Sequence, residues 1–156
     1  MNILLISPKY DSYIIAPHLG LGYLSSYLKK NGHKVKVLDG LREDVVYDPK
    51  DWDIVGVSAM STYFPECCAE VDRAKSFGLK TIIGGPHIIC DPESSLMDSK
   101  ADYAAIGEGE RTLNQLANGI EPSMVEGLVY WENGKTKRSN PNIQNLQLEG
   151  KKGEMS

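Results

Sequence analysis

The segment Thr81-Ile82-Ile83-Gly84-Gly85-Pro86-His87 decides the fold class of this 156-residue chain. A short β-branched run leads directly into two glycines and a proline. An apolar run without alternation is typical of a strand buried on both faces of a parallel sheet. Glycines at its carboxyl end lack Cβ atoms, so another group can approach the backbone there. Because ligands bind beyond the carboxyl ends of strands in open α/β sheets, the segment predicts a ligand-binding α/β domain.

Length and composition are those of one globular domain. Hydrophobic residues make up 41% of the chain and charged residues 24%, with a formal net charge of −4. No run of Lys or Arg exceeds two residues, which argues against a nucleic-acid partner. No stretch is long enough to span a membrane, and residues 1–6 favour a first strand over a signal peptide. Three cysteines, an odd number, suit a reducing compartment, so we expect a cytoplasmic protein.

The hydrophobic pattern predicts strands that alternate with helices. We expect five strands at residues 2–7, 35–38, 53–58, 81–83 and 103–106. We expect helices at about residues 18–31, 65–76, 91–97 and 110–118, and a loop at residues 84–91. Gly32 should end the first helix in a left-handed conformation, and Asp91 should cap the start of the third. This alternation predicts a flavodoxin-like (Rossmann-like) doubly wound parallel sheet of five strands in the order 2-1-3-4-5.

The pattern changes after the last of these helices. Gly127-Leu128-Val129-Tyr130-Trp131 and Lys135-Thr136-Lys137 flank Asn133-Gly134, the strongest short hairpin signal. We therefore predict a domain at residues 1–139, with the α/β core at 1–120 and a β-hairpin at 125–139. Residues 140–156 are polar and aperiodic, which predicts a linker or a disordered tail.

The loops expected at the carboxyl edge lack the motifs of several common chemistries. There is no G-x-x-x-x-G-K-[ST] phosphate loop, no G-x-S-x-G nucleophile elbow, and no aspartate at the receiver position, where Ser58 stands. Small and hydroxyl residues occupy the loops instead: Ser58, Ser61, Thr62, Gly84, Gly85, Gly107 and Gly109. Such a weakly charged edge has room for a broad, flat ligand.

Several segments, taken in their order and spacing, resemble one family. They are Pro17-His18-Leu19-Gly20-Leu21-Gly22-Tyr23-Leu24, Asn31-Gly32-His33-Lys34-Val35, Asp53-Ile54-Val55-Gly56-Val57-Ser58, Gly84-Gly85-Pro86-His87 with Pro92-Glu93, and Asp102-Tyr103 with Gly107-Glu108-Gly109-Glu110. From residue 1 to about residue 139 the chain resembles the N-terminal cobalamin (vitamin B12)-binding domain of cobalamin-dependent radical S-adenosylmethionine enzymes.

The resemblance implies cobalamin as the cofactor, with the corrin ring across the carboxyl edge and the nucleotide tail between strands one and three. Ser58 is similar in place to a serine that hydrogen-bonds the base of the tail. Gly84 and Gly85 are similar to the glycines that let the tail pass. The cofactor-binding residues implied are Pro8, Lys9, Tyr10, Leu19, Gly20, Ser58, Ala59, Met60, Ser61, Thr62, Gly84, Gly85, Pro86, His87, Gly107, Glu108 and Gly109.

Two motifs of related enzymes are missing. The first loop has no D-x-H-x-x-G, so binding would be base-off without a histidine on cobalt; Tyr10, Tyr13 and Met60 are candidates for its lower-face neighbour. No C-x-x-x-C-x-x-C is present to hold a [4Fe–4S] cluster. The cluster and S-adenosylmethionine would therefore need a radical enzyme barrel in cis or in trans, and we expect no catalysis by this chain alone. The resemblance implies that the whole enzyme is either methyltransferase-like or rearranging.

Two other functions stay open at this point. The chain resembles, more loosely, the N-terminal Rossmann-like half of a two-domain glycosyltransferase, or it is an interaction module whose ligand site has decayed. Several conspicuous residues also have purely structural interpretations: Cys67 and Cys68 as buried small residues, His18 as a helix-start residue, His87 as a loop residue, Glu108 and Glu110 at a helix amino terminus, and Tyr130 and Trp131 as cover for a sheet edge.

Overall fold

The computed structural model describes residues 1–9, 19–60, 63–107 and 109–140. The first half of the chain contains β1 (Asn2–Ser7), α1 (Leu19–Lys30), β2 (Lys34–Asp39), β3 (Ile54–Ser58) and α2 (Phe64–Ser76). The second half contains β4 (Lys80–Gly84), α3 (Pro86–Cys90), α4 (Pro92–Ser99), β5 (Tyr103–Ala105), α5 (Glu110–Ala117), β6 (Leu128–Glu132) and β7 (Lys135–Arg138). Two short 3₁₀ turns, at Pro49–Asp51 and Pro122–Met124, complete the described elements.

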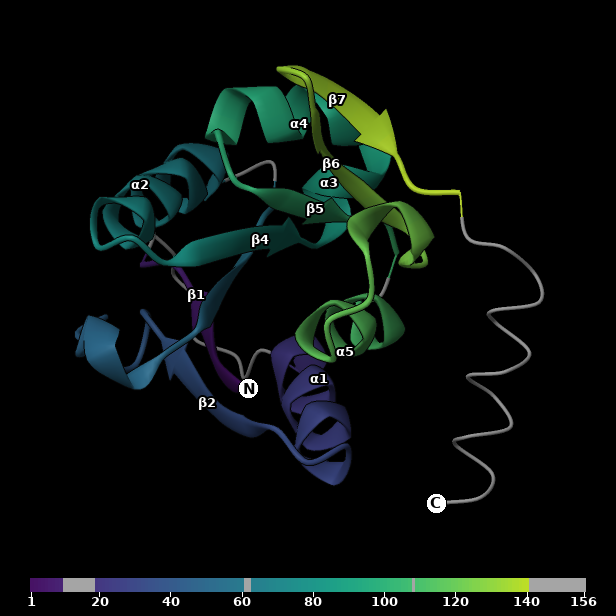
Figure 1. Cartoon of the computed structure of the whole chain (residues 1–156). Helices are drawn as coiled ribbons and strands as arrows, with labels where there is room; N and C mark the ends of the chain where they lie inside the picture. The colour runs from purple at the N-terminus through teal and green to yellow at the C-terminus, as the bar shows by residue number, and fades with distance from the viewer. Residues whose placement is uncertain (10–18, 61–62, 108, 141–156) are drawn as a thin grey trace.

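All the described strands belong to one sheet in the order β2-β1-β3-β4-β5-β6-β7 (Figure 1). The pairings from β2 to β5 are parallel, whereas β6 and β7 run antiparallel. The prediction of a five-stranded sheet is therefore wrong in strand number. The expected hairpin forms, with a turn at Asn133 and Gly134, which both have positive φ. It adds to the edge of β5, because Leu128, Val129 and Tyr130 pair with β5 and are buried.

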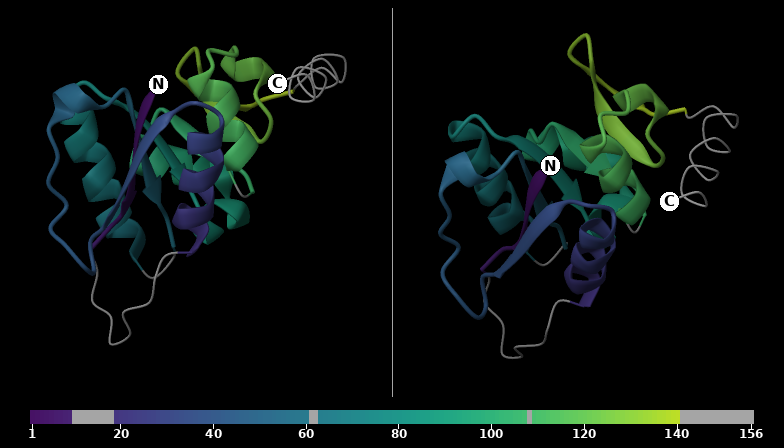
Figure 2. Two further views of the ribbon diagram at one scale, coloured as in Figure 1. Left: turned by 90° about the horizontal axis from the view of Figure 1, so that it is seen from below. Right: turned by 60° about the horizontal axis from the view of Figure 1, so that its bottom comes forward.

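Helices cover both faces of the sheet (Figure 2). Alternate residues of β1 point to opposite sides, so Leu4 and Ile6 join one hydrophobic core while Ile3 and Leu5 join the other. The first core packs against α2, α3 and α4, and the second against α1 and α5. This double burial explains why β1 and β3 read as uninterrupted apolar runs.

Helix boundaries follow local capping signals. Gly32 takes a left-handed conformation after α1 (φ 89°), as the Asn31-Gly32 signal predicts. Asp91 caps α4 by accepting a hydrogen bond from the Ser94 N–H. One interpretation was wrong: residues 84–91 were expected as a loop, but Pro86–Cys90 form α3. Its residue Ile88 is completely buried, and this packing stabilises a helix too short for propensity alone to predict.

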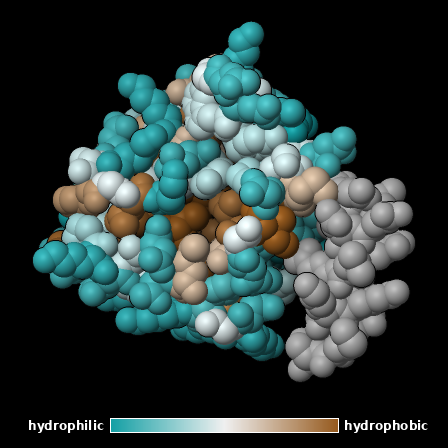
Figure 3. Space-filling view, in the orientation of Figure 1, coloured by the Kyte–Doolittle hydropathy of each residue, from teal (hydrophilic) through white to brown (hydrophobic). Residues whose placement is uncertain are grey.

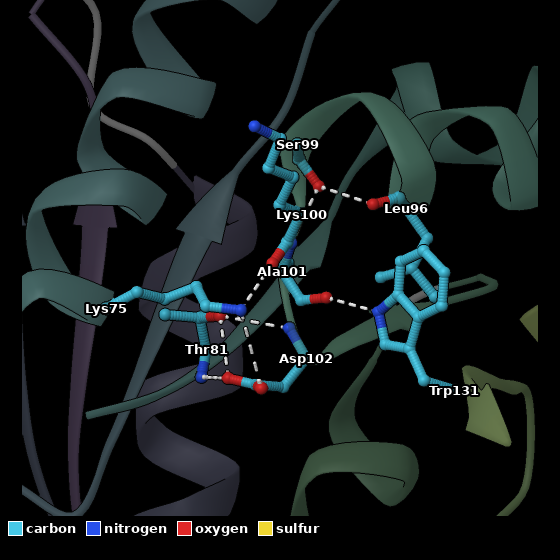
Figure 4. A network of polar contacts seen from close by, with 8 residues as sticks. All are labelled: Lys75, Thr81, Leu96, Ser99, Lys100, Ala101, Asp102 and Trp131. Carbon is cyan, nitrogen blue, oxygen red and sulfur yellow. Dashed lines mark hydrogen bonds and ion pairs between the residues drawn. The ribbon is translucent and has the colours of Figure 1, made fainter. Parts of the chain in front are cut away.

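A polar network fastens the amino end of β4 (Figure 4). The carboxylate of Asp102 accepts hydrogen bonds from the backbone N–H and the hydroxyl of Thr81, at 2.9 and 3.1 Å. The ammonium of Lys75, on α2, lies 3.7 Å from the same carboxylate. The indole N–H of Trp131 donates to the Ala101 carbonyl at 2.8 Å. The network thus joins α2, β4, the start of β5 and the hairpin.

The surface seen in Figure 3 is mostly hydrophilic, with hydrophobic residues gathered in a band across the middle. Among the described residues, no helix combines the length and the hydrophobicity that crossing a membrane requires.

Candidate functional site

The carboxyl ends of the parallel strands meet at one edge, and a groove opens there between α1, α5 and the sheet. Its volume is about 560 Å³, within the usual range of small-molecule sites. The described residues that line it are Leu5, Gly20, Leu21, Tyr23, Leu24, Gly56, Val57, Ser58, Ile82, Ile83, Gly84, Gly85, Pro86, Ile89, Ala105, Gly107, Gly109, Glu110 and Leu113. Most of these side chains are hydrocarbon, so the groove suits an apolar, extended group.

The central residue of β3, Gly56, lines the groove without a side chain. Gly56 pairs with Leu5 of β1 and Ile82 of β4. A Cβ atom on Gly56 would lie 2.9 Å from the Leu5 Cδ2 atom and 3.6 Å from the Ile82 Cγ2 atom. A side chain at this position would therefore collide with the Leu5 side chain, whereas the distance to Ile82 is an ordinary contact.

The two glycines after β4 have different roles. A Cβ on Gly84 would meet only the Ala105 Cβ, at 3.8 Å, so Gly84 leaves open space in the groove. Gly85 has φ +122°, and a Cβ there would lie 2.6 Å from the Ala59 carbonyl oxygen. Gly85 is thus required by the close approach of the chain's own backbone.

Ser58 lies at the end of β3 and is buried. Its hydroxyl is 3.3 Å from the hydroxyl of Tyr63, which is also buried and precedes α2. The next residue, Ala59, is fully buried and binds neighbouring backbone: its N–H donates to the Gly84 carbonyl at 2.7 Å. This pairing fixes the β3 and β4 ends side by side, with Ser58 facing the groove.

His87 lies on α3 and stacks on the ring of Phe64, with centroids 4.0 Å apart. Its backbone N–H donates to the Ala59 carbonyl. His87 is not among the residues that line the groove. The other described histidine, His33, is buried, with one ring nitrogen 2.9 Å from the Asn114 amide oxygen. Both described histidines therefore have structural contacts away from the groove wall.

The fifth strand opens into a turn with two left-handed glycines. Gly107 has φ +99° and Gly109 has φ +84°. Gly109 precedes α5, and Glu110 occupies the first turn of that helix, where a negative charge is favoured by the helix dipole. Both glycines and Glu110 line the groove, so the turn forms its wall beside α5.

Of the residues that the sequence assigned to the site, seven line this groove: Gly20, Ser58, Gly84, Gly85, Pro86, Gly107 and Gly109. Pro8, Lys9, Ala59, Met60 and His87 are described but do not line it. Tyr10, Ser61, Thr62 and Glu108 lie outside the described residues, as do His18, Tyr13 and the side chain of Leu19. A cofactor contact stays a prediction for each of these residues.

Sequence reasoning missed the deep part of the groove, formed mainly by Leu5, Leu21, Gly56, Ile82, Ala105 and Leu113. The lone glycine in the apolar run 53–58 was a usable signal, because a glycine inside a strand often marks a close approach. The apolar residues carried no such signal, since they are indistinguishable in sequence from ordinary core.

The three cysteines lie on two helices, Cys67 and Cys68 on α2 and Cys90 at the end of α3. Cys67 is buried on α2, and burial raises the pKa of its thiol far above the usual range. Within the described ranges, no group of three His, Cys, Asp or Glu residues is placed to hold a metal ion. Cys67 is thus a small core residue, as its structural interpretation predicts, whereas Cys68 is only partly buried.

Comparison with known proteins identifies the family. Residues 10–117 match the family described as the B12 binding domain. The chain belongs to this family. The match confirms the resemblance stated from sequence and favours the cobalamin hypothesis over the glycosyltransferase and interaction-module alternatives.

The chain is also similar to curated relatives in sequence and to solved structures in fold. An uncharacterized methyltransferase from Pyrococcus horikoshii is 33% identical over 168 residues, covering 94% of this chain and 36% of that protein. The radical S-adenosylmethionine methyltransferase TsrM from Kitasatospora setae, solved with cobalamin and a [4Fe-4S] cluster bound, matches with a TM-score of 0.77. It is 21% identical over 91% of this chain and 29% of its own. The cobalamin-dependent radical enzyme OxsB, with aqua-cobalamin bound, gives a TM-score of 0.69 at 20% identity, covering 95% of this chain and 23% of its own.

The chain spans about a third of the length of the curated relatives it matches, 36% of one and 35% of another.

Proposed function

We propose that this domain binds cobalamin with the corrin ring across the carboxyl edge of the sheet and the nucleotide tail in the groove between α1, α5 and the strands. The observation that carries the proposal is the groove of about 560 Å³ at the carboxyl edge, whose described lining is mostly hydrocarbon. Two lining residues, Gly56 in the middle of the sheet and Gly84 at its edge, add no side chain to the groove.

The residues fit the parts of this cofactor. A planar aromatic base needs apolar walls, which Leu5, Ile82 and Leu113 supply. A hydrogen-bonding nitrogen on the base needs one polar partner, and the Ser58 hydroxyl lies at the groove wall. The glycine turn at Gly107 and Gly109 leaves room where the groove opens to the edge.

The tail held in the groove would be detached from cobalt, and no histidine would replace it. His87 and His33 support this proposal, because their rings contact Phe64 and Asn114 rather than the groove. Of the three candidates for a neighbour on the lower face of cobalt, Met60 belongs to the described residues. It is 37% exposed and follows the end of β3.

Bound cobalamin supplies a cobalt centre that can carry a methyl group or an electron, and the protein contributes binding, orientation and exclusion of water. We propose that the chain serves in this way a radical S-adenosylmethionine barrel, in cis or in trans. The names of the relatives support a methyltransferase as the whole enzyme.

Titration of the purified chain with hydroxocobalamin tests the proposal. The expected result is a change in the visible spectrum that saturates at one corrinoid per chain, with co-elution on gel filtration. After reduction to cob(II)alamin, the electron paramagnetic resonance spectrum should lack the splitting that an axial nitrogen causes. An unchanged spectrum without co-elution, from protein with a native circular dichroism spectrum, would refute cobalamin binding. Nitrogen splitting would refute the base-off arrangement alone.

A further inference from the structure

We infer that the groove selects among natural corrinoids by the base of their nucleotide tail, and that it prefers a benzimidazole to a purine. The inference rests on the proposed function, since it concerns the same groove. It extends that function from binding of a corrinoid to recognition of one chemical class of tail.

As far as the described residues form it, the deep part of the groove offers mainly hydrocarbon contact. Leu5, Leu21, Ile82 and Leu113 are each less than 8% exposed, and all belong to the core between the sheet and α1 and α5. The strand backbone behind them is paired in the parallel ladder: Gly56, for example, is held between β1 and β4. Backbone donors and acceptors at this depth are therefore already used within the sheet.

The described part of the groove wall carries few polar side chains. Among the described lining residues, three carry polar side-chain atoms: Ser58, Tyr23 and Glu110. Tyr23 is 68% exposed at the mouth, and Glu110 lies half-buried on the first turn of α5. Ser58 is the buried member of the three, with its hydroxyl within 3.3 Å of the Tyr63 hydroxyl.

The two kinds of base differ in the ring that is fused to the imidazole. Both bases offer an imidazole nitrogen, for which a single hydroxyl such as that of Ser58 is a sufficient partner. In cobalamin the fused ring is a benzene with two methyl groups, which an apolar wall accepts. In the adenine form, pseudocobalamin, it is a pyrimidine with two ring nitrogens and an amino group. Enclosed by leucine and isoleucine, those three groups would lose their hydrogen bonds to water without replacement.

The ease with which each base detaches from cobalt has the opposite effect on the relative affinity of the two corrinoids. Adenine is the less basic ligand and detaches more easily, so a base-off site without selective walls would favour pseudocobalamin. A preference for cobalamin can then be assigned to the groove itself.

Equilibrium binding of three corrinoids to the full chain tests the inference. They are cobalamin, pseudocobalamin and cobinamide, which has the corrin ring but no base. We expect pseudocobalamin to bind at least tenfold more weakly than cobalamin, a difference of about 1.4 kcal/mol. Dissociation constants within twofold of each other, or tighter binding of pseudocobalamin, would overturn the inference.

Two variants locate the effect. Gly84→Val fills the groove at the end of β4, where a Cβ meets only Ala105. In this variant the dissociation constants of cobalamin and pseudocobalamin should therefore lie within twofold of each other. Gly22→Ala is the matched control, because Gly22 lies on the exposed side of α1 and its Cβ would meet nothing within 4 Å. Gly22→Ala should keep the wild-type ratio of the dissociation constants of the two corrinoids. A tenfold preference that survives in Gly84→Val would place the selection outside the groove and overturn the inference.

Failure of the inference is distinguishable from failure of the proposed function. If neither cobalamin nor cobinamide binds to folded protein, cobalamin binding itself is refuted. If both natural corrinoids bind equally well, the domain binds corrinoids but does not select the base.

Discussion

Replacing Gly84 by valine should close the groove while leaving the fold intact. Gly84 is the last residue of β4 and is paired with Ser58 of β3. Its φ is not positive, and its carbonyl accepts the Ala59 N–H, a bond that valine retains. An added Cβ meets only the Ala105 Cβ, at 3.8 Å, which is ordinary contact. Valine also favours strands, so stability should stay within about 1 kcal/mol of the wild type.

The effect on binding should be much larger. The two methyl groups of valine would occupy space that the tail needs, and forcing extra methyl groups into a filled apolar space typically costs about 1–3 kcal/mol. This corresponds to binding of cobalamin that is about 5-fold to 150-fold weaker. Gly84→Ala, which adds a single methyl group, should lie between wild type and valine.

Absorbance titration measures the dissociation constants, and thermal unfolding checks the fold. Gly22→Ala serves as the matched glycine replacement and should bind as the wild type does. Wild-type affinity in a folded Gly84→Val protein would refute the location of the tail. A variant that loses affinity only together with its folded circular dichroism spectrum would refute the claim that the space at Gly84 is free.

Three further predictions concern stability and reactivity. Burial raises the pKa of Glu70, opposed in part by Arg73, so its carboxylate lowers stability once the pH rises above the folded pKa. Glu70→Gln should then unfold at a higher urea concentration than the wild type at pH 7. The difference should vanish below about pH 4, where Glu70 is protonated in both the folded and the unfolded state. Equal urea midpoints at pH 7 would contradict this. Asp102→Ala leaves the buried Thr81 N–H without its acceptor and should lower the free energy of unfolding by about 1–3 kcal/mol. Cobalamin affinity should not change, because the network lies at the amino end of β4. In folded protein, iodoacetamide should modify the exposed Cys90 but not Cys67, because burial raises the pKa of the Cys67 thiol. If mass spectrometry finds Cys67 modified as fast as Cys90, the buried position of Cys67 is contradicted.

The parallel part of the fold could be predicted from the sequence because each signal was local. The apolar runs of β1 and β3, the Asn31-Gly32 stop after α1 and the Asp91 cap all appear where the pattern placed them. The attachment of the hairpin to β5 could not be predicted. A turn signal fixes which two strands pair with each other, but not the third strand against which they pack.

The candidate site was predictable at its rim and not in its depth. Glycines and hydroxyl residues at strand ends stand out in a sequence, and Ser58, Gly84 and Gly107 do line the groove. Leu5 and Ile82 line it too, but they carry the same apolar signature as residues that fill the core. The formation of α3 was hidden for a related reason, since a helix of five residues depends on the tertiary contact of Ile88.

The position of the cofactor is tested most directly by anomalous diffraction at the cobalt absorption edge, on crystals of the protein loaded with cobalamin. The proposal predicts one strong peak beyond the carboxyl ends of β3 and β4, with density for the nucleotide tail leading past Gly84 toward Gly56. A cobalt peak elsewhere on the molecule, or a groove filled by the protein's own side chains beneath a base-on corrinoid, would contradict it.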